Sequence, residues 1–133
     1  MNVEYKLNKD ITPDEFIEVL SHSSLGARRP LDDMQTIKGM IKNADIIITA
    51  NIDDKIVGVA RAVTDFTYCC YLSDLSVHVN YQKQGIGQKL IEKIKEQLTK
   101  NCNIILLAAP AATGYYPKIG FTQHNSAWIS KTF

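Results

Sequence analysis

The feature that most constrains this chain is a glycine-containing junction at residues 81–91, YQKQGIGQKLI, between an extended run and an amphipathic helix. Residues 71–79, YLSDLSVHV, precede the junction and read as a β-strand. After it, apolar residues recur at helical spacing: Ile86, Leu90, Ile91, Ile94 and Leu98. The apolar run at residues 104–108, IILLA, is typical of a strand covered on both faces. The sequence therefore predicts a parallel β-α-β crossover.

The rest of the chain predicts an otherwise antiparallel sheet and two further main helices. Two β-branched runs flank Asp53-Asp54, which is a hairpin signal. Thr12, Pro13 and Glu15 form a helix start with a capping box. The remaining predicted elements are a strand over residues 1–7, a helix over about 13–20, a helix opened by Pro30, Asp32 and Asp33, strands over 45–52, 55–63 and 68–79, a short helix over 111–116, and two last strands starting at Gly120 and Ala127. The predicted class is α/β (α+β), with helices on both faces of a mixed, mostly antiparallel sheet.

Length and composition indicate one domain over residues 1–133. The formal net charge of +1 lacks the basic field on which nucleic-acid binding depends, so no nucleic-acid partner is expected. No apolar run reaches the roughly 20 residues that span a bilayer, and no signal peptide is visible. Cys69, Cys70 and Cys102 do not look like a disulfide framework. These features favour a cytoplasmic protein.

The glycine junction, residues 82–87, is suited to binding an anion. Backbone N–H groups at a helix start are unpaired, and the helix dipole favours a phosphate there. The glycines at positions 85 and 87 remove Cβ atoms that would keep a pyrophosphate away. A dinucleotide-binding fingerprint would need a third glycine where Leu90 stands, and a P-loop would need Gly-Lys-Ser/Thr. An ordinary strand–helix turn that needs glycine is the structural alternative.

Three segments, in this order, carry a family resemblance. The first is Gln82-Lys83-Gln84-Gly85-Ile86-Gly87, which matches the pattern Gln/Arg-x-x-Gly-x-Gly/Ala. The second is Leu75-Ser76-Val77, and the third is Tyr115-Tyr116-Pro117-Lys118-Ile119-Gly120-Phe121, which matches Phe/Tyr-Tyr-x-Lys-x-Gly-Phe. With the predicted element order, nearly the whole chain resembles the GNAT superfamily of N-acetyltransferases. Many members place an Asn seven residues before the motif Tyr, where this chain has Ala109.

The resemblance implies acetyl-CoA as the cofactor and a small-molecule or peptide amine as the acceptor. It implies that residues 82–87 hold the pyrophosphate and that Leu75, Ser76 and Val77 line the pantetheine. Tyr116 is the implied proton donor to the departing thiolate, because a phenol keeps its proton at neutral pH. The backbone N–H near Leu75 is the implied donor to the oxyanion. No metal is expected, since no set of candidate ligands has metal-binding spacing.

The base that deprotonates the amine is the least defined part of this prediction. In strict alternation Leu72, Asp74, Ser76 and His78 share one face of their strand, a parity that a bulge would break. Asp74 is a carboxylate in an apolar strand, which is costly unless it is hydrogen-bonded or functional. It is the candidate base, and hydrogen bonding to neighbouring backbone is the alternative. His78 is a second candidate base.

The predicted function is transfer of an acetyl group from acetyl-CoA to a primary amine, by direct attack in a ternary complex. A non-catalytic acyl-CoA-binding regulatory module on the same fold is the alternative, and a nucleotide-phosphate binder is a third hypothesis. Arg28 and Arg29 either grip an acidic group of the substrate or pair with Asp32 and Asp33. The last predicted strand leaves an open edge, which favours a homodimer.

Overall fold

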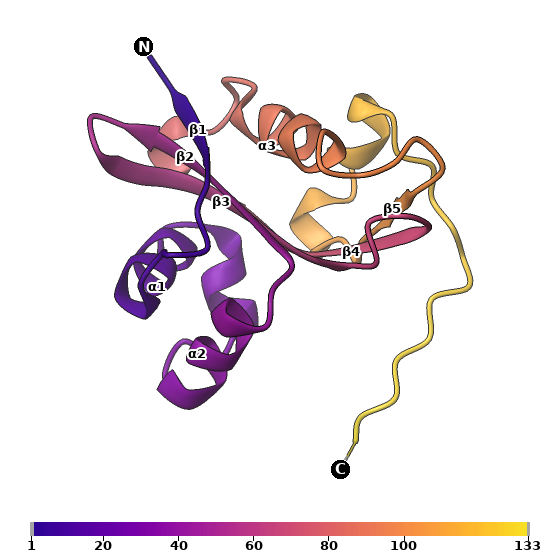
Figure 1. Cartoon of the computed structure of the whole chain (residues 1–133), viewed down its shortest axis with the longest axis horizontal. Coiled ribbons are helices and arrows are strands. Elements are labelled where there is room, and N and C mark those ends of the chain that lie inside the picture. The colour runs from indigo at the N-terminus through magenta and orange to yellow at the C-terminus, as the bar shows by residue number, and fades with distance from the viewer. Residues whose placement is uncertain (1, 133) are drawn as a thin grey trace.

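The computed structural model describes residues 2–132 and contains one five-stranded sheet (Figure 1). The strands are β1 (Glu4–Leu7), β2 (Ile46–Ile52), β3 (Lys55–Thr64), β4 (Cys69–Val77) and β5 (Asn103–Ile105), and they lie in this order across the sheet. Neighbouring strands are antiparallel except β4 and β5, which are parallel. The predicted mixed sheet with one parallel crossover is confirmed. Met1, part of the predicted first strand, and Phe133 lie outside the described residues.

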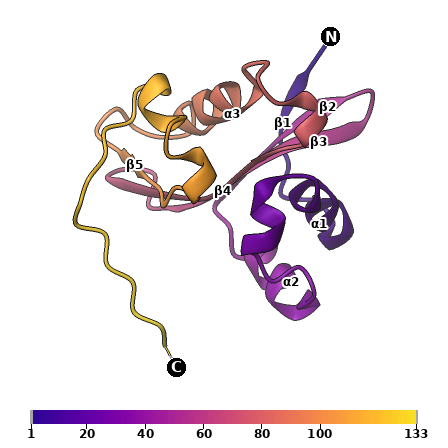
Figure 2. The same cartoon turned by 180° about the vertical axis from the view of Figure 1, so that it is seen from behind.

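Helices cover both faces of the sheet (Figures 1 and 2). The helices α1 (Pro13–Ser21) and α2 (Met34–Lys42) pack on one face, and α3 (Ile86–Lys95) packs on the other. The predicted capping box starts α1, because Thr12 and Glu15 each accept a hydrogen bond from the backbone N–H of the other. The predicted apolar stripe of α3 is buried from Ile86 to Ile94. No helix within residues 2–132 is long and apolar enough to cross a membrane.

The hairpin between β2 and β3 turns on two aspartates. Asp53 and Asp54 have φ angles of 48° and 66°, and two positive values in succession are the signature of a type I′ turn. Asp tolerates this left-handed region better than bulkier residues do. The tight turn pairs Ile52 with Lys55 and fixes the register of the two central strands. Because these strands are buried on both faces, the register decides which residues meet the helices.

A bulge in β4 decides which of its side chains face α3. The β3 partners of Leu72 and Asp74 are adjacent residues, so Ser73, which lies between them, is the extra residue of the strand. Leu72 therefore joins the apolar core beneath α3, whereas Asp74 and Ser76 bond groups beside α1 on the opposite face. The strict alternation predicted through this strand is wrong at Leu72.

The chain after β5 differs from the prediction. β5 has only three residues, and Ile105 and Leu107 are 56% and 46% exposed, so the strand is not covered on both faces. Two 3-10 turns, Pro110–Ala112 and Tyr116–Ile119, replace the single short helix. The predicted strands from Gly120 and Ala127 do not form, because residues 122–132 run away from the sheet with no strand beside them (Figure 1).

Candidate active site

The site lies where β4 and β5 separate. Their parallel ladder ends at the pair Tyr71 and Ile105, while β4 continues along β3 to Val77. A cavity of about 50 Å³ opens just beyond this point, between the loop that precedes α2 and the segment that follows β5. Its lining includes Arg29, Ser73, Leu75, Leu107 and Tyr116. The crossover thus brings Leu75 and Tyr116, which are far apart in sequence, to one cavity.

The backbone of Leu75 faces the opening. The N–H of His78 donates to the carbonyl of Val57 in β3, at 2.8 Å. Successive N–H groups along a strand alternate in direction, so those of Ser76 and Asp74 also point to β3. The N–H groups of Leu75 and Val77 therefore point to the side that β5 has left. The structure thus places the predicted oxyanion donor, Leu75, at the cavity.

Ser76 does not face this opening. Its hydroxyl donates to the Ser23 hydroxyl at 2.7 Å and lies 3.3 Å from the carbonyl of Val19 in α1. Its backbone groups point to β3 by the same alternation. Of the three predicted pantetheine-lining residues, only Leu75 and Val77 present backbone to the cleft, because neighbouring residues of a strand direct their backbone groups to opposite sides.

Asp74 is held between two arginines. One carboxylate oxygen accepts from Nε of Arg29 and the other from Nε of Arg61, and the Asp74 side chain has no exposed surface. The Nη2 groups bind the bulge, because that of Arg29 donates to the Ser73 carbonyl and that of Arg61 donates to the Ser73 hydroxyl, both at 2.8 Å. The Nη1 groups donate to the backbone carbonyls of Arg28 and Met40. A base must reach the substrate's proton directly or through one water. This arrangement therefore argues against Asp74 as the base.

Two members of this cluster, Arg61 and Ser73, were not predicted from the sequence. Arg61 interrupts the apolar run KIVGVARAV, and a charged residue in a buried strand needs a buried partner. That requirement, together with Asp74 in the next strand, was a readable signal. Ser73 carried none, because its role follows from the bulge. Arg29 pairs with Asp74 instead of Asp32 or Asp33, and Arg28 is exposed.

Tyr116 and Tyr115 connect the cavity to the start of α3. The two rings meet edge to face with centroids 5.3 Å apart, and Tyr116 meets Phe121 in the same way at 5.4 Å. Burial, and secondarily the neighbouring Tyr115, raise the pKa of Tyr116 above the ordinary 10.0 of a tyrosine. Tyr116 is therefore a protonated donor at neutral pH. Tyr115 is 36% exposed and lies against α3.

The structure explains the presence of glycine at positions 85 and 87 in two different ways. Gly85 is the N-cap of α3 and has a φ of 82°, a left-handed conformation that favours glycine. Gly87 is needed because a Cβ there would lie 2.7 Å from the Tyr115 hydroxyl oxygen. Both glycines therefore have a structural reason that is separate from the predicted approach of a pyrophosphate.

The first turn of α3 presents free backbone donors. No side chain caps it, and the first helical bond runs from Lys89 N–H to the Gly85 carbonyl. The N–H groups of residues 86–88 consequently have no helical acceptor. The exposed side chain of Gln82 donates to the Val77 carbonyl at 2.9 Å, so it joins the end of β4 to this turn. Lys83 and Gln84 are exposed beside it.

The ring of His78 packs against other groups of the protein. Its ring stacks on that of His22 with centroids 4.5 Å apart, and its Nδ1 accepts from the Asn80 N–H at 3.1 Å. Burial, then the positive charges of His22 and Lys55, lower the pKa of His78 below its ordinary 6.5, with Glu18 opposing weakly. A neutral, buried ring on the α1 side of the sheet does not face the cavity.

This environment predicts acid sensitivity. The folded-state pKa of His78 is depressed, so the full free energy of unfolding is present above the unfolded pKa of about 6.5, where the ring is neutral in both states. Part of that free energy is lost as pH falls from there through the folded-state pKa, because the unfolded chain binds the proton more readily. We expect the unfolding free energy to decrease between about pH 7 and pH 5, and to decrease less in His78→Gln. Urea unfolding at several pH values measures this. The exposed His124→Gln is the control, and equal slopes in both variants would refute the assignment.

The comparisons with known proteins agree with this geometry. The profile of the acetyltransferase (GNAT) domain family matches residues 13–131. An uncharacterised N-acetyltransferase, ycf52, of Pyropia yezoensis is 32% identical over 122 residues, covering 87% of this chain and 68% of the relative. A probable acetyltransferase of Glycine max is 28% identical, covering 89% of this chain and 58% of its own length. This chain thus spans about three fifths to two thirds of these relatives.

Solved structures show the same fold at full length. A probable acetyltransferase of methicillin-resistant Staphylococcus aureus superposes with a TM-score of 0.81 at 19% identity, covering 99% of this chain and 100% of that one. A GNAT family acetyltransferase of Streptococcus pneumoniae gives 0.79 at 20% identity, covering 98% and 99%. At such identities the likeness concerns the fold, whereas the profile match concerns the sequence. The chain belongs to the GNAT acetyltransferase family.

Proposed function

We propose that this protein transfers an acetyl group from acetyl-CoA to a primary amine by direct attack in a ternary complex. One observation carries the proposal: Leu75 and Tyr116 line the same cavity at the point where β4 and β5 part. One residue presents a backbone N–H and the other a phenol that keeps its proton. These are the two donors that acyl transfer from a thioester needs.

The residues around the opening fit the cofactor. The uncapped first turn of α3 offers the N–H groups of residues 86–88, and an added Cβ at Gly85 would meet nothing within 4 Å, so the turn is open. The backbone edge of β4 at Leu75 and Val77 would hold the pantetheine amides as a neighbouring strand does. Gln82 would release the Val77 carbonyl for that purpose. When bound, the cofactor supplies an acetyl thioester as the acyl donor.

Each group at the cavity has a distinct task. The Leu75 N–H would donate to the carbonyl oxygen as negative charge develops on it. The Tyr116 hydroxyl would give its proton to the departing sulfur, because a thiolate leaves more readily when it is protonated. The amine must lose its own proton, since an alkyl ammonium of pKa about 10.4 is not a nucleophile. We assign that proton to water at the mouth of the cavity, because Asp74 and His78 are both engaged elsewhere.

We propose that Asp74 is a positioning residue. Arg29 and Arg61 bind both its carboxylate and the neighbouring Ser73, so the cluster holds the bulge that brings Leu72 to the core and leaves Leu75 facing the cleft. Arg29 also belongs to the cavity lining. Its guanidinium thus ties the loop that precedes α2 to β4.

The proposal is tested by measuring CoA thiol release from acetyl-CoA with a panel of amines, and by confirming the acetylated product by mass. We expect amine-dependent thiol release. Binding of acetyl-CoA without turnover across alkyl amines, polyamines, amino acids, aminoglycosides and peptides would favour the regulatory module instead. Competition of ATP or NAD with CoA in a thermal-shift assay would favour the nucleotide binder.

A substitution in the first turn of α3 tests the proposed binding of CoA at that turn. In Gly87→Ala the new Cβ narrows the approach of an anion to the first-turn N–H groups and also meets the Tyr115 hydroxyl, and we expect roughly tenfold weaker CoA binding by calorimetry, about 1.4 kcal/mol. Adding Tyr115→Phe removes the internal conflict, so an affinity that stays low in the double variant reports the Cβ itself. Gly114→Ala is the matched control, because a Cβ there meets nothing within 4 Å. Unchanged affinity in Gly87→Ala would refute the binding of CoA at this turn.

We also propose a reducing compartment, the cytoplasm in the simplest case. All three cysteines are free thiols, and burial raises the pKa of Cys70, which makes it a poor nucleophile. Two relatives from Arabidopsis thaliana are named chloroplastic, so a plastid is the competing location. Cell fractionation with an antibody against the chain separates the two.

A further inference from the structure

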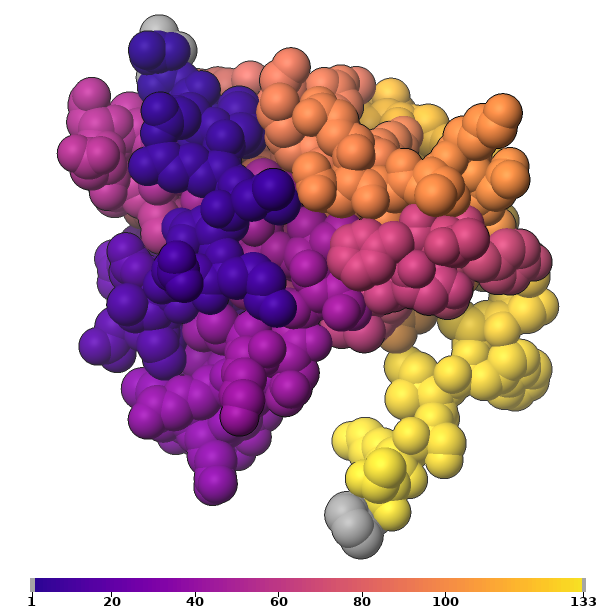
Figure 3. Space-filling model, viewed as in Figure 1, coloured from indigo at the N-terminus to yellow at the C-terminus, as the bar shows by residue number. Residues whose placement is uncertain are grey.

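Exposed apolar surface adjoins the cavity that Leu75 and Tyr116 line, hereafter the acceptor cavity. Leu107 belongs to its lining and is 46% exposed. Ile105 and Tyr71, register partners at the end of the β4–β5 ladder, are 56% and 41% exposed. The space-filling view shows open space beside this end of the sheet, between α2 and residues 122–132 (Figure 3). A ligand that covers such surface gains free energy, so we expect the acceptor to have an apolar part.

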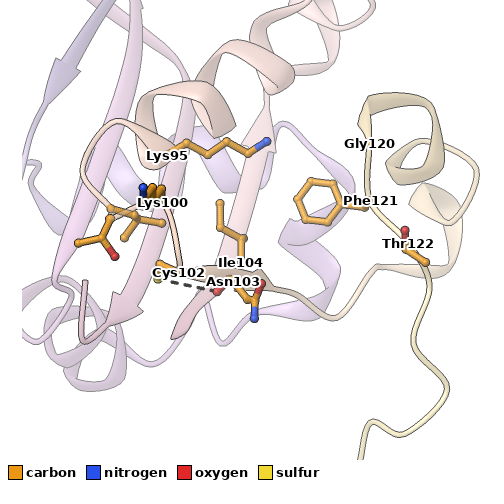
Figure 4. Close-up of a pocket in the computed structure, with 10 residues that line it drawn as sticks. Lys95, Lys100, Cys102, Asn103, Ile104, Gly120, Phe121 and Thr122 are labelled. Carbon is orange, nitrogen blue, oxygen red and sulfur yellow. Dashed lines mark hydrogen bonds between the residues drawn. The ribbon is translucent and has the colours of Figure 1, made fainter. Parts of the chain in front are cut away.

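A second, larger cavity is not the place of the reaction. It has a volume of about 420 Å³ and lies at the C-terminal end of α3, where Lys95, Ile104 and Phe121 line it (Figure 4). Neither Leu75 nor Tyr116 belongs to that lining. The acceptor cavity, of about 50 Å³, therefore determines which amines can react.

The acceptor cavity lies beside an uncompensated positive charge. Arg29 and Arg61 share one carboxylate, that of Asp74, and no other carboxylate within residues 2–132 forms an ion pair with either arginine. Two positive guanidinium groups and one negative carboxylate leave one positive charge. Arg29 lines the cavity, and none of the described residues in that lining is acidic. The cavity therefore favours a substrate with a negative group and disfavours one with several positive charges.

The Arg29 guanidinium has donors left for that negative group. Of its five N–H groups, Nε donates to Asp74, one on Nη1 donates to the Arg28 carbonyl at 2.9 Å, and one on Nη2 donates to the Ser73 carbonyl at 2.8 Å. One N–H on each Nη atom thus has no acceptor among residues 2–132. Two donors on one guanidinium suit a carboxylate that binds through both oxygens. The Arg29 side chain is 20% exposed, so a ligand can reach it.

The size of the acceptor cavity limits the distance between the amine and the acid on the substrate. A volume of about 50 Å³ holds only a few water-sized groups. Leu75 and Arg29 both line this space, so the attacking nitrogen and the group that Arg29 binds are only a few atoms apart. An α-amino acid carries its amine and its carboxylate on the same carbon, which fits this short span. The terminal carboxylate of a long peptide lies too far from the terminal amine.

Building on the proposed function, we propose that the acceptor is an α-amino acid with an apolar side chain. Its carboxylate binds the two remaining N–H groups of Arg29, and its side chain lies on Leu107 and Ile105. The amine nitrogen bonds to the acetyl carbon as the carbon–sulfur bond breaks. The nitrogen gives its proton to water, while the sulfur takes a proton from Tyr116, which regains one from water. The products are an N-acetyl amino acid and free CoA.

A set of matched acceptors tests the proposal on the unaltered protein. We expect kcat/KM to be about 10- to 100-fold higher for leucine than for leucinamide or for 3-methylbutylamine, which is leucine without its carboxylate. Leucinamide is the stricter comparison, because its amine resembles a peptide α-amino group of pKa about 7.7–8.0 and is more often deprotonated at neutral pH than an alkyl amine. Spermidine, which carries several positive charges, should also be poorer than leucine.

The outcomes separate this proposal from the proposed reaction. Equal or higher kcat/KM for leucinamide, 3-methylbutylamine or spermidine would overturn the amino-acid acceptor and leave acetyl transfer in place. Turnover of no amine at all would remove both.

Substitution of Arg29 tests whether this residue carries the preference. Arg29→Lys keeps a positive charge beside Asp74 but loses the paired donors. We expect the ratio of kcat/KM for leucine to that for leucinamide to fall about tenfold. A loss of folded protein lowers both values alike and leaves their ratio unchanged. Arg28→Lys, at the exposed neighbour outside the lining, is the control and should keep the wild-type ratio. An unchanged ratio in Arg29→Lys would refute the role of Arg29.

Discussion

Replacing Tyr116 with phenylalanine will lower kcat for acetyl transfer by about 10²-fold or more while leaving CoA affinity within about twofold. The variant keeps the ring, and with it the edge-to-face contacts with Tyr115 and Phe121. Only the hydroxyl at the cavity is lost, so the proposed CoA-binding turn at the start of α3 is unchanged. Steady-state thiol release gives kcat, and calorimetry with CoA gives the affinity.

The pH dependence sharpens this test. Because the pKa of Tyr116 is raised above the ordinary 10.0, the phenol stays protonated throughout the neutral range, and its titration cannot shape the pH profile there. The ratio of wild-type to Tyr116→Phe kcat should therefore stay constant between about pH 7 and pH 9. Tyr68→Phe, at a residue 69% exposed, serves as the control. Equal kcat values for Tyr116→Phe and the wild type would remove Tyr116 from the mechanism.

The Asp74→Asn substitution will destabilise the protein by about 3–5 kcal/mol. It leaves the guanidinium groups of Arg29 and Arg61 close together without their shared counter-charge, in a place where Asp74 itself has no exposed side-chain surface. Chemical denaturation measures the loss. Asp32→Asn, at an exposed position, should stay within about 0.5 kcal/mol. A similarly small change for Asp74→Asn would mean that the cluster contributes nothing to the fold.

The same variant separates positioning from base catalysis when it is assayed at a temperature where it remains folded. Loss of positioning lowers kcat by a similar factor at every pH, because the bulge and the Leu75 N–H are displaced. Loss of a base would instead abolish the acid limb of the pH profile. Arg61→Met, at the more buried arginine, should be more destabilising than Arg29→Met, and coupling of each to Asp74→Asn follows from double-mutant cycles.

Local signals predicted much of the architecture. Helix starts with a capping residue, such as Thr12 and Asp33, depend on side chains within a few positions of the backbone groups that they satisfy. The turn at Asp53 and Asp54 is equally local. The last two predicted strands failed for the opposite reason: a strand exists only beside a neighbour, and residues 122–132 have none within the described chain.

The features of the candidate site also fall into those that are local in the sequence and those that depend on the tertiary structure. The sequence alone determined the glycine turn, the tyrosine motif and the crossover between them, because each is written in adjacent residues or in a simple period. Only the tertiary structure decided that Ser73 bulges out, that Arg29 and Arg61 enclose Asp74, and that Ser76 faces α1. A bulge shifts the parity of every residue after it, and a buried charge selects its partner by position in space. The bulge leaves no local pattern in the chain, and the buried charges of Arg61 and Asp74 are visible in the sequence without showing the full set of residues that they bind.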